Sequence, residues 1–378
     1  MKTPAVIFLL LSVMFSVPGW STETRNDLSL NNKNIKKLEE TVLNQNLTLE
    51  KRIKALKVLL SDQMVDGHLK RTFCIWDPLG KNGPVAAATR DQILRSLHYG
   101  MDLSIEVFQN EETLVNKFTR DNDCDAILIR GASAMRFNRF LATVEAPGAI
   151  TSRDQLYLLA QVLAKPDIAP RLSDEKYTAL GLVTLGGNHI FASSRKHASL
   201  SAFQELPVGI PDTDRGSAWL TSALKGEPQS ASLPATVQYF SEGAVEVVIA
   251  PDIGYLVMGQ GQTGVTTVAI KPEVGQSTLQ LIGRAERFPP GLALILREDF
   301  LFRFNNYARL VDKELSNIPA NFWVTPTEDE KKILASTSQE TRLSLREQGF
   351  YDSAMLRLAR KIRCRFEPAN TECSNPIE

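Results

Sequence analysis

The sequence predicts an α/β fold with two lobes and a helical extension at each end. From Arg71 onward, short apolar segments typical of strands alternate with segments that have helical periodicity. Later apolar segments are ordered so that the chain would leave a first unit, build a second one and return. The length of 378 residues also exceeds the roughly 150 residues of an average domain, so two hydrophobic cores are expected.

The first lobe is expected to begin with residues 71–185. Strands at 73–76, 103–108 and 126–129 alternate with helices at 85–99 and 111–120, and a further helix is expected at 154–163. This β-α-β-α-β order predicts a parallel sheet with right-handed crossovers, in which the first strand lies between the other two.

The second lobe is expected at residues 186–250. It would contain strands at 189–192, 208–210 and 236–240 and a helix at 218–224, and a buried strand at 245–251 would leave it. Residues 251–310 would return to the first lobe through strands at 278–284 and 292–297. Lobes that the chain enters twice are typical of hinged proteins that bind a ligand in the cleft between them.

Both ends of this body are predicted to be helical. Residues 22–70 contain apolar residues spaced three and four apart between 31 and 61, which predicts an amphipathic helix or a helical pair. We expect it to pack on the body rather than to form a dimerising coil, because fewer than three clean heptads are present. Residues 311–378 form the C-terminal part, with helices expected at 302–314, 328–348 and 352–363.

Residues 1–21 have the pattern of a cleavable secretion signal. Lys2 precedes an apolar run at 5–17, and Pro18 to Ser21 supply a small-residue cleavage site. The apolar run is shorter than the roughly 20 residues of a spanning helix, so a membrane anchor is disfavoured. The mature protein is therefore expected outside the cytoplasm, with no membrane span.

The four cysteines are predicted to form two disulfides, because an even number of cysteines in an exported protein indicates bridges. Of the three possible pairings, we favour Cys74–Cys124 and Cys364–Cys373. Cys74 and Cys124 would each begin one of two neighbouring parallel strands, and Cys364 and Cys373 enclose a short polar segment that can turn. No cysteine has a histidine at metal-ligand spacing, so neither a metal nor a cofactor is predicted.

Composition and motifs argue against two other classes of function. The 43 basic residues balance the 43 acidic ones, and no basic stripe indicates nucleic acid. The four histidines are scattered, and no serine-elbow, zinc-protease or nucleotide-binding motif is present. An enzyme is therefore not expected, although a hydrolase that uses Asp or Glu stays a less favoured alternative.

Several segments, taken together, resemble one known family. They are Cys74-Ile75-Trp76-Asp77-Pro78-Leu79-Gly80, the segment 124–131 with Phe137-Asn138, residues 146–150, 318–324 and 349–352, and the surroundings of Cys364 and Cys373. In these the chain is similar to bacterial solute-binding proteins that are associated with RND-type transporters and related to the DctP-type binding proteins of TRAP transporters. The resemblance implies a two-lobed, type II periplasmic-binding-protein-like fold, a periplasmic location and capture of a small molecule. Residues 132–136 depart from the arginine-rich pattern of that family, so the ligand's identity is not implied.

Candidate ligand-binding residues follow the carboxyl ends of the predicted strands, where open α/β sheets bind ligands. Asp77, Lys81 and Asn82 precede a helix whose free N–H groups would favour an anion, although a tight turn alone would also explain this loop. Arg130, Arg136 and Asn138 follow the third strand, where a guanidinium could hold a carboxylate, unless these arginines are simply solvated. From the second lobe and the crossing segments come two further candidates, Asn188 and Tyr255, although core packing would also explain Tyr255.

The sequence therefore predicts a periplasmic solute-binding protein. It would capture a small, anionic organic molecule, such as a carboxylate, in the interlobe cleft and deliver it to inner-membrane transporter components. The alternative is an accessory protein of a transport or efflux system whose cleft is vestigial.

Overall fold

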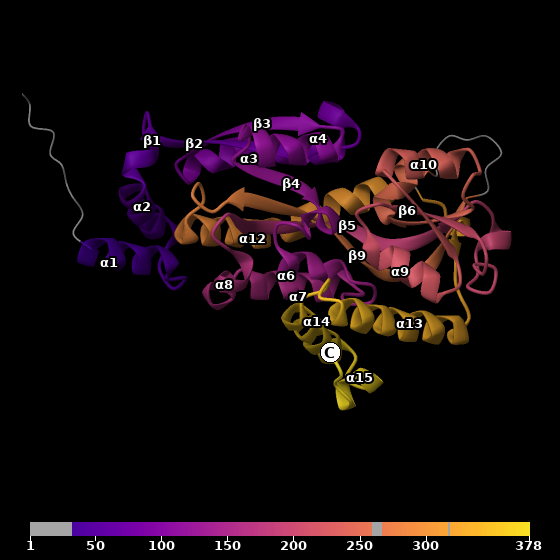
Figure 1. Ribbon diagram of the computed structural model, residues 1–378. Coiled ribbons are helices and arrows are strands. Elements are labelled where there is room, and N and C mark those ends of the chain that lie inside the picture. The colour runs from indigo at the N-terminus through magenta and orange to yellow at the C-terminus, as the bar shows by residue number, and fades with distance from the viewer. Residues whose placement is uncertain (1–31, 259–266, 317) are drawn as a thin grey trace, which may run out of the picture.

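The computed structural model describes residues 32–258, 267–316 and 318–378, and in it a single mixed sheet runs through both lobes (Figure 1). The predicted secretion signal lies outside these residues. The strands follow the order β1-β2-β4-β9-β5-β8-β6-β7, with β3 beside β2 and β10 beside β9. Their bounds are β1 Met64–Val65, β2 His68–Trp76, β3 Met101–Phe108, β4 Ala126–Arg130, β5 Tyr177–Ala192, β6 Pro207–Pro211, β7 Glu227–Ala231, β8 Val247–Pro251, β9 Val268–Arg284 and β10 Trp323–Val324.

Two long antiparallel strands, β5 and β9, connect the lobes. On β5 the hydrophobic core of the first lobe extends to Leu185, and that of the second lobe begins at Ile190. On β9 the border between the two cores lies between Val274, which belongs to the second lobe's core, and Leu279, which belongs to the first lobe's core. Each lobe thus has its own core, while the backbone ladder between β5 and β9 continues across the border.

The first lobe has the predicted parallel arrangement. Strand β2 lies between β3 and β4 and is parallel to both, and β9 returns antiparallel to β4. Helices α3 Pro84–His98, α4 Glu111–Asn116, α7 Arg153–Leu163 and α12 Pro290–Leu315 pack in this lobe (Figure 1). The shorter helices α5 Gly131–Ala134, α6 Arg139–Ala142 and α8 Ala169–Leu172 connect its strands.

The prediction of a strand at 292–297 is wrong. These residues lie at the beginning of α12, the longest helix described. Six consecutive residues, 292–297, are buried because this end of the helix is covered by the sheet on one side and by the N-terminal extension on the other. A helix that is buried all round loses the polar face from which its period is recognised. No helix in the described ranges is both long and apolar enough to cross a membrane.

The second lobe contains β6, β7 and β8 together with α9 Arg215–Ala223 and α10 Leu233–Ser241. The prediction of a strand at 236–240 is wrong, because this segment lies within α10. The Ser232 side chain accepts a hydrogen bond from the N–H of Ala235 and so caps the helix, and Thr236 and Phe240 are buried at a spacing of four. The short helix α11 Tyr255–Met258 follows β8.

The N-terminal extension is a helical pair, α1 Asn32–Leu43 and α2 Leu49–Leu59, that packs on the body as expected. Val42 is fully buried and would lie 2.5 Å from a Cβ placed on Gly291 of α12. Arg52 donates two hydrogen bonds, of 2.7 and 3.0 Å, to the carboxylate of Glu298. Apolar packing and a bidentate ion pair therefore hold the extension against α12.

The C-terminal helices are α13 Glu328–Glu347, α14 Ser353–Phe366 and α15 Thr371–Ser374. Helix α13 lies against α9 of the second lobe, whereas α14 packs on α7 of the first lobe (Figure 1). This part of the chain therefore touches both lobes.

The structure confirms both predicted disulfides, Cys74–Cys124 and Cys364–Cys373. Cys74 lies near the carboxyl end of β2 rather than at its start, because the strand already begins at His68. The first bridge joins β2 to the residues just before its parallel neighbour β4, across a sequence separation of 50. The second joins α14 to α15 across a sequence separation of nine.

Removing Cys74–Cys124 should cost more stability than removing Cys364–Cys373. The entropy of closing a chain loop predicts losses of about 4 and about 3 kcal/mol, because the first loop is longer. Urea unfolding of the two double Cys→Ala variants measures the difference. Intact mass with and without reduction checks the oxidation state, and four free thiols in exported protein would contradict both bridges.

Candidate ligand-binding cleft

A cleft with a volume of about 1010 Å³ lies between the lobes. The first lobe contributes residues that follow β2 and β4, and the second lobe contributes residues that follow β6 and β8. Phe350 and Tyr351, from the turn between α13 and α14, also line it. The cleft thus lies at the carboxyl ends of strands from both lobes, where ligands of open α/β sheets bind.

Asp77, the first candidate, serves to cap a helix. Its side chain is completely buried and accepts hydrogen bonds from the backbone N–H groups of Val85 at 2.9 Å and Ala86 at 3.0 Å. The N-terminus of α3 does bind an anion, as predicted, but the anion is this carboxylate. A Cβ on Gly83 would lie 2.0 Å from the same carboxylate, so the loop requires glycine there.

Four other candidates also lie outside the set of residues that line the cleft. Lys81 and Asn82 are exposed on a short 3₁₀ turn before α3. Asn138 accepts a hydrogen bond from the N–H of Leu141 and caps α6. The Tyr255 ring is buried with its centroid 4.9 Å from that of Phe322, which is the core packing considered as its alternative.

Arg130 lines the cleft, but an internal carboxylate already binds its guanidinium. Its Nε and Nη2 donate to Glu111 Oε2 at 2.9 and 2.5 Å, and the guanidinium lies 5.5 Å from the centroid of the Trp76 ring. Ser133 donates to the same carboxylate oxygen at 2.8 Å. Arg130 also donates to Thr213 Oγ1, in the second lobe, at 3.3 Å. The hydrogen bond from Arg130 to Thr213 is therefore one of the contacts between the lobes.

Arg136 and Asn188, also predicted, line the cleft and have no side-chain partner in the part of the chain that the structure describes. Sequence reasoning missed Arg215, which faces the cleft from the second lobe. Its guanidinium donates to Gln348 Oε1 at 2.5 Å and lies 5.1 Å from the centroid of the Phe350 ring. Neither partner of Arg215 is an acid, so its charge is not neutralised. The cleft thus offers one uncompensated guanidinium from each lobe.

Glu145, a second residue that sequence reasoning missed, faces the cleft beside β9. Its Oε1 accepts hydrogen bonds from Thr278 N at 2.5 Å and Thr278 Oγ1 at 2.7 Å. Burial raises the pKa of the Glu145 carboxyl to about 7, although the hydrogen bonds from Thr278 act in the opposite direction. Near neutral pH this carboxyl is therefore protonated in part of the molecules. No motif in the sequence marks this residue.

The lining carries more acids than bases. Besides the three arginines it contains five carboxylates, of which Glu111 is paired with Arg130 and Asp214 caps α9. Glu112 and Asp212 are exposed. Anion binding must therefore depend on local contacts with the uncompensated guanidinium groups, because the cleft as a whole is not positively charged.

A serine, a histidine and a glutamate converge elsewhere, in the second lobe, but they are not arranged as a catalytic triad. Ser193 Oγ lies 3.2 Å and Glu246 Oε2 lies 3.1 Å from the same nitrogen, Nδ1 of His197. A triad needs the serine and the acid on opposite ring nitrogens, so that the histidine can accept a proton from the serine. This group also lies outside the cleft lining. In the described ranges, no cluster of three or more potential ligands could hold a metal ion.

The fold is that of two-lobed solute-binding proteins. A TRAP periplasmic solute-binding protein of Desulfovibrio salexigens, solved with bound orotic acid, aligns with a TM-score of 0.64 and 10% identity over 78% of this chain and 99% of that one. A solute receptor of Bordetella pertussis, DctP7, which binds pyroglutamic acid, aligns with a TM-score of 0.58 and 12% identity over 77% and 98%.

The chain belongs to the family described as "Solute-binding protein AdeT 1/2", which matches residues 90–378. Two Acinetobacter baumannii proteins are similar to it. "Probable solute-binding protein AdeT1" is 25% identical over 79% of this chain and 99% of its own length, and "Probable solute-binding protein AdeT2" is 22% identical over 57% and 91%. The helical pair α1 and α2 precedes the matched region.

Replacing Glu145 with Gln should make stability less dependent on pH. The folded state holds the pKa of Glu145 at about 7, above the ordinary value of 4.5, so the stability it contributes is complete below pH 4.5 and is lost as the pH rises through 7. Relative to Glu145→Gln, the wild type should lose on the order of 2–3 kcal/mol of unfolding free energy between about pH 4.5 and 8. Urea unfolding across this range measures the loss. Parallel curves for both proteins would contradict it, and Glu112→Gln, on the exposed face of α4, is the control.

Proposed function

We propose that this protein captures a small organic solute with a carboxylate group in the interlobe cleft, in the periplasm, and presents it to an inner-membrane transporter. The observation that carries the proposal is that the cleft is lined from both lobes at the carboxyl ends of their strands. A ligand that contacts both lobes stabilises the closed arrangement more than the open one, and a transporter can recognise that difference.

Arg136 and Arg215 are the proposed carboxylate-binding residues. A guanidinium presents paired N–H donors that match the two oxygens of a carboxylate. Since the two arginines line the cleft from opposite lobes, a solute held by both would draw the lobes together. The organic acids bound to the structural relatives, orotic acid and pyroglutamic acid, support this class of ligand. Asn188 is the proposed neutral partner from the crossing strand.

A vestigial cleft is the second candidate, and one observation favours it. Glu111 already binds Arg130 through two hydrogen bonds, as a bound carboxylate would. In that case the protein would act through its surface as an accessory component of a transport or efflux system. The two candidates differ in whether the cleft binds any solute.

Isothermal titration calorimetry with a panel of small mono- and dicarboxylates should therefore identify a ligand. Arg136→Gln should weaken its binding by about tenfold to hundredfold, because one charge-assisted interaction is lost. Arg120→Gln removes another exposed arginine, which does not line the cleft, and this variant should bind as the wild type does. If no carboxylate binds, the proposal is wrong and the vestigial cleft is favoured. Equal effects of the two variants would exclude Arg136 as a ligand contact.

Glu111→Gln should tighten carboxylate binding by about tenfold. The substitution removes a negative charge that repels the solute's carboxylate. The neighbouring variant Glu112→Gln removes the same charge without touching Arg130, so its effect should be smaller. Calorimetry at two salt concentrations compares them. Equal changes in both variants would mean that only the net charge of the cleft matters, and that the Arg130–Glu111 pair plays no specific part.

A further inference from the structure

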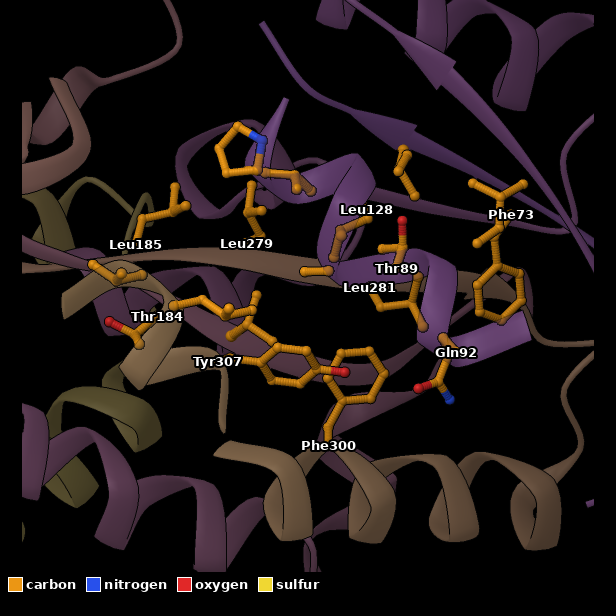
Figure 2. Close-up of a pocket in the computed structure, with 18 of the residues that line it drawn as sticks. Phe73, Thr89, Gln92, Leu128, Thr184, Leu185, Leu279, Leu281, Phe300 and Tyr307 are labelled. Atoms are coloured by element: carbon orange, nitrogen blue, oxygen red, sulfur yellow. The ribbon is translucent and has the colours of Figure 1, made fainter. Parts of the chain in front are cut away.

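A second, smaller hollow lies in the first lobe beneath α3, between that helix, α12 and the sheet (Figure 2). Its volume is about 80 Å³, and 16 of its 21 lining residues have apolar side chains. Figure 2 shows the rings of Phe300 and Tyr307, from α12, opposite Leu128, Leu279 and Leu281 of the sheet. We call this hollow the apolar chamber.

Three of the five polar side chains that line the apolar chamber have hydrogen-bond partners, whereas Tyr307 and Glu314 have none within the described part of the chain. Thr89 donates to the carbonyl of Ala86 at 2.9 Å, and the Thr184 hydroxyl accepts from the N–H of Gly186 at 2.9 Å. Gln92 donates to Asp299 at 3.1 Å. A water molecule needs two to four polar partners to be held in a cavity, so this surface suits an apolar occupant better than water.

The apolar chamber adjoins the cleft. Four residues line both hollows: Pro84 and Val85 at the start of α3, Leu185 on β5 and Ile253 after β8. The first three belong to the first lobe or its border, and Ile253 lies in the turn that follows β8. All four shared residues have apolar side chains, so the border between the cleft and the chamber presents an apolar surface to an incoming group.

We propose that the apolar chamber receives a short alkyl group of the solute whose carboxylate is held in the cleft. The inference rests on the proposed function and narrows the ligand to an amphiphilic carboxylate. The volume sets the size of the group: about 80 Å³ is roughly half of the ~150 Å³ of a cavity that takes benzene, which suits three or four carbons.

The test is calorimetric titration of the wild type with straight-chain carboxylates from acetate to octanoate and with 3-methylbutanoate. Each methylene that enters the apolar chamber should tighten binding about fourfold. The gain should stop once roughly three or four carbons are buried, because the chamber is then full.

Two neighbouring alanines of α3 provide matched variants. Ala88 lines the chamber, whereas Ala87 is exposed and does not. Ala88→Leu should fill the chamber and abolish the dependence on chain length while acetate still binds, and Ala87→Leu should keep the full dependence. Ala88→Val, a smaller change, should shorten the optimal chain if Ala88→Leu does not fold.

The outcomes separate this inference from the proposed function. If carboxylates bind without dependence on chain length, or if Ala88→Leu keeps the dependence, the inference is wrong and the proposed function stands. If no carboxylate binds, the proposed function is wrong and the ligand assignment falls with it. Xenon then tests the chamber itself: shifts of the Leu128 and Leu279 methyl signals in wild type and Ala87→Leu, but not in Ala88→Leu, would support an accessible apolar site, and no shifts would overturn it.

Discussion

The pairing of β5 with β9 is the constraint on which the two-lobed architecture depends. The ladder contains register shifts near Gly181, Gly186 and Asn188, so it bends where one core gives way to the other. At Gly186 φ is +97°, and a Cβ would lie 2.6 Å from Asp252 Oδ2. The same oxygen accepts from the N–H of Gly187 at 2.6 Å. The bend is therefore held by one carboxylate from the segment after β8, and a side chain at Gly186 would displace it.

A buried ionic cluster gives the lobes their second connection. Arg342 of α13 and Arg363 of α14 share the carboxylates of Glu372 and Glu378, and all four side chains are less than 10% exposed. The two arginines also donate to backbone carbonyls of the segment 146–150, which bonds β9 through Gly148. Since two positive and two negative charges are buried together with hydrogen-bond partners, the desolvation cost is offset within the cluster. The C-terminal tail thus fastens α13 and α14 to the base of the crossing strands.

Much of the fold could be predicted from periodicity, and the failures have physical reasons. The parallel order around β2 follows from the alternation of short apolar strands with helices, and it brings Cys74 and Cys124 together. The predictions for the start of α12 and for residues 236–240 of α10 were wrong. Burial on several sides obscured the helical period in α12, and β-branched residues obscured it in α10. The ion pair of Arg130 with Glu111 links residues 19 apart, and Glu145 stands in no motif. Such contacts depend on strand register, which the pattern of residue types does not contain.

The candidate site illustrates why residue type and position are insufficient to assign a ligand contact. Asp77 and Arg130 lie at the carboxyl ends of β2 and β4, where the fold predicts binding, yet the helix N-terminus binds Asp77 and Glu111 binds Arg130. A charge that is already paired adds little to the affinity for a solute, because binding must first break the internal contact. Selectivity then rests with the groups that the fold leaves uncompensated. Arg136 and Arg215 meet this condition, and under the proposed function an anion held by both of them, one from each lobe, would also favour closure.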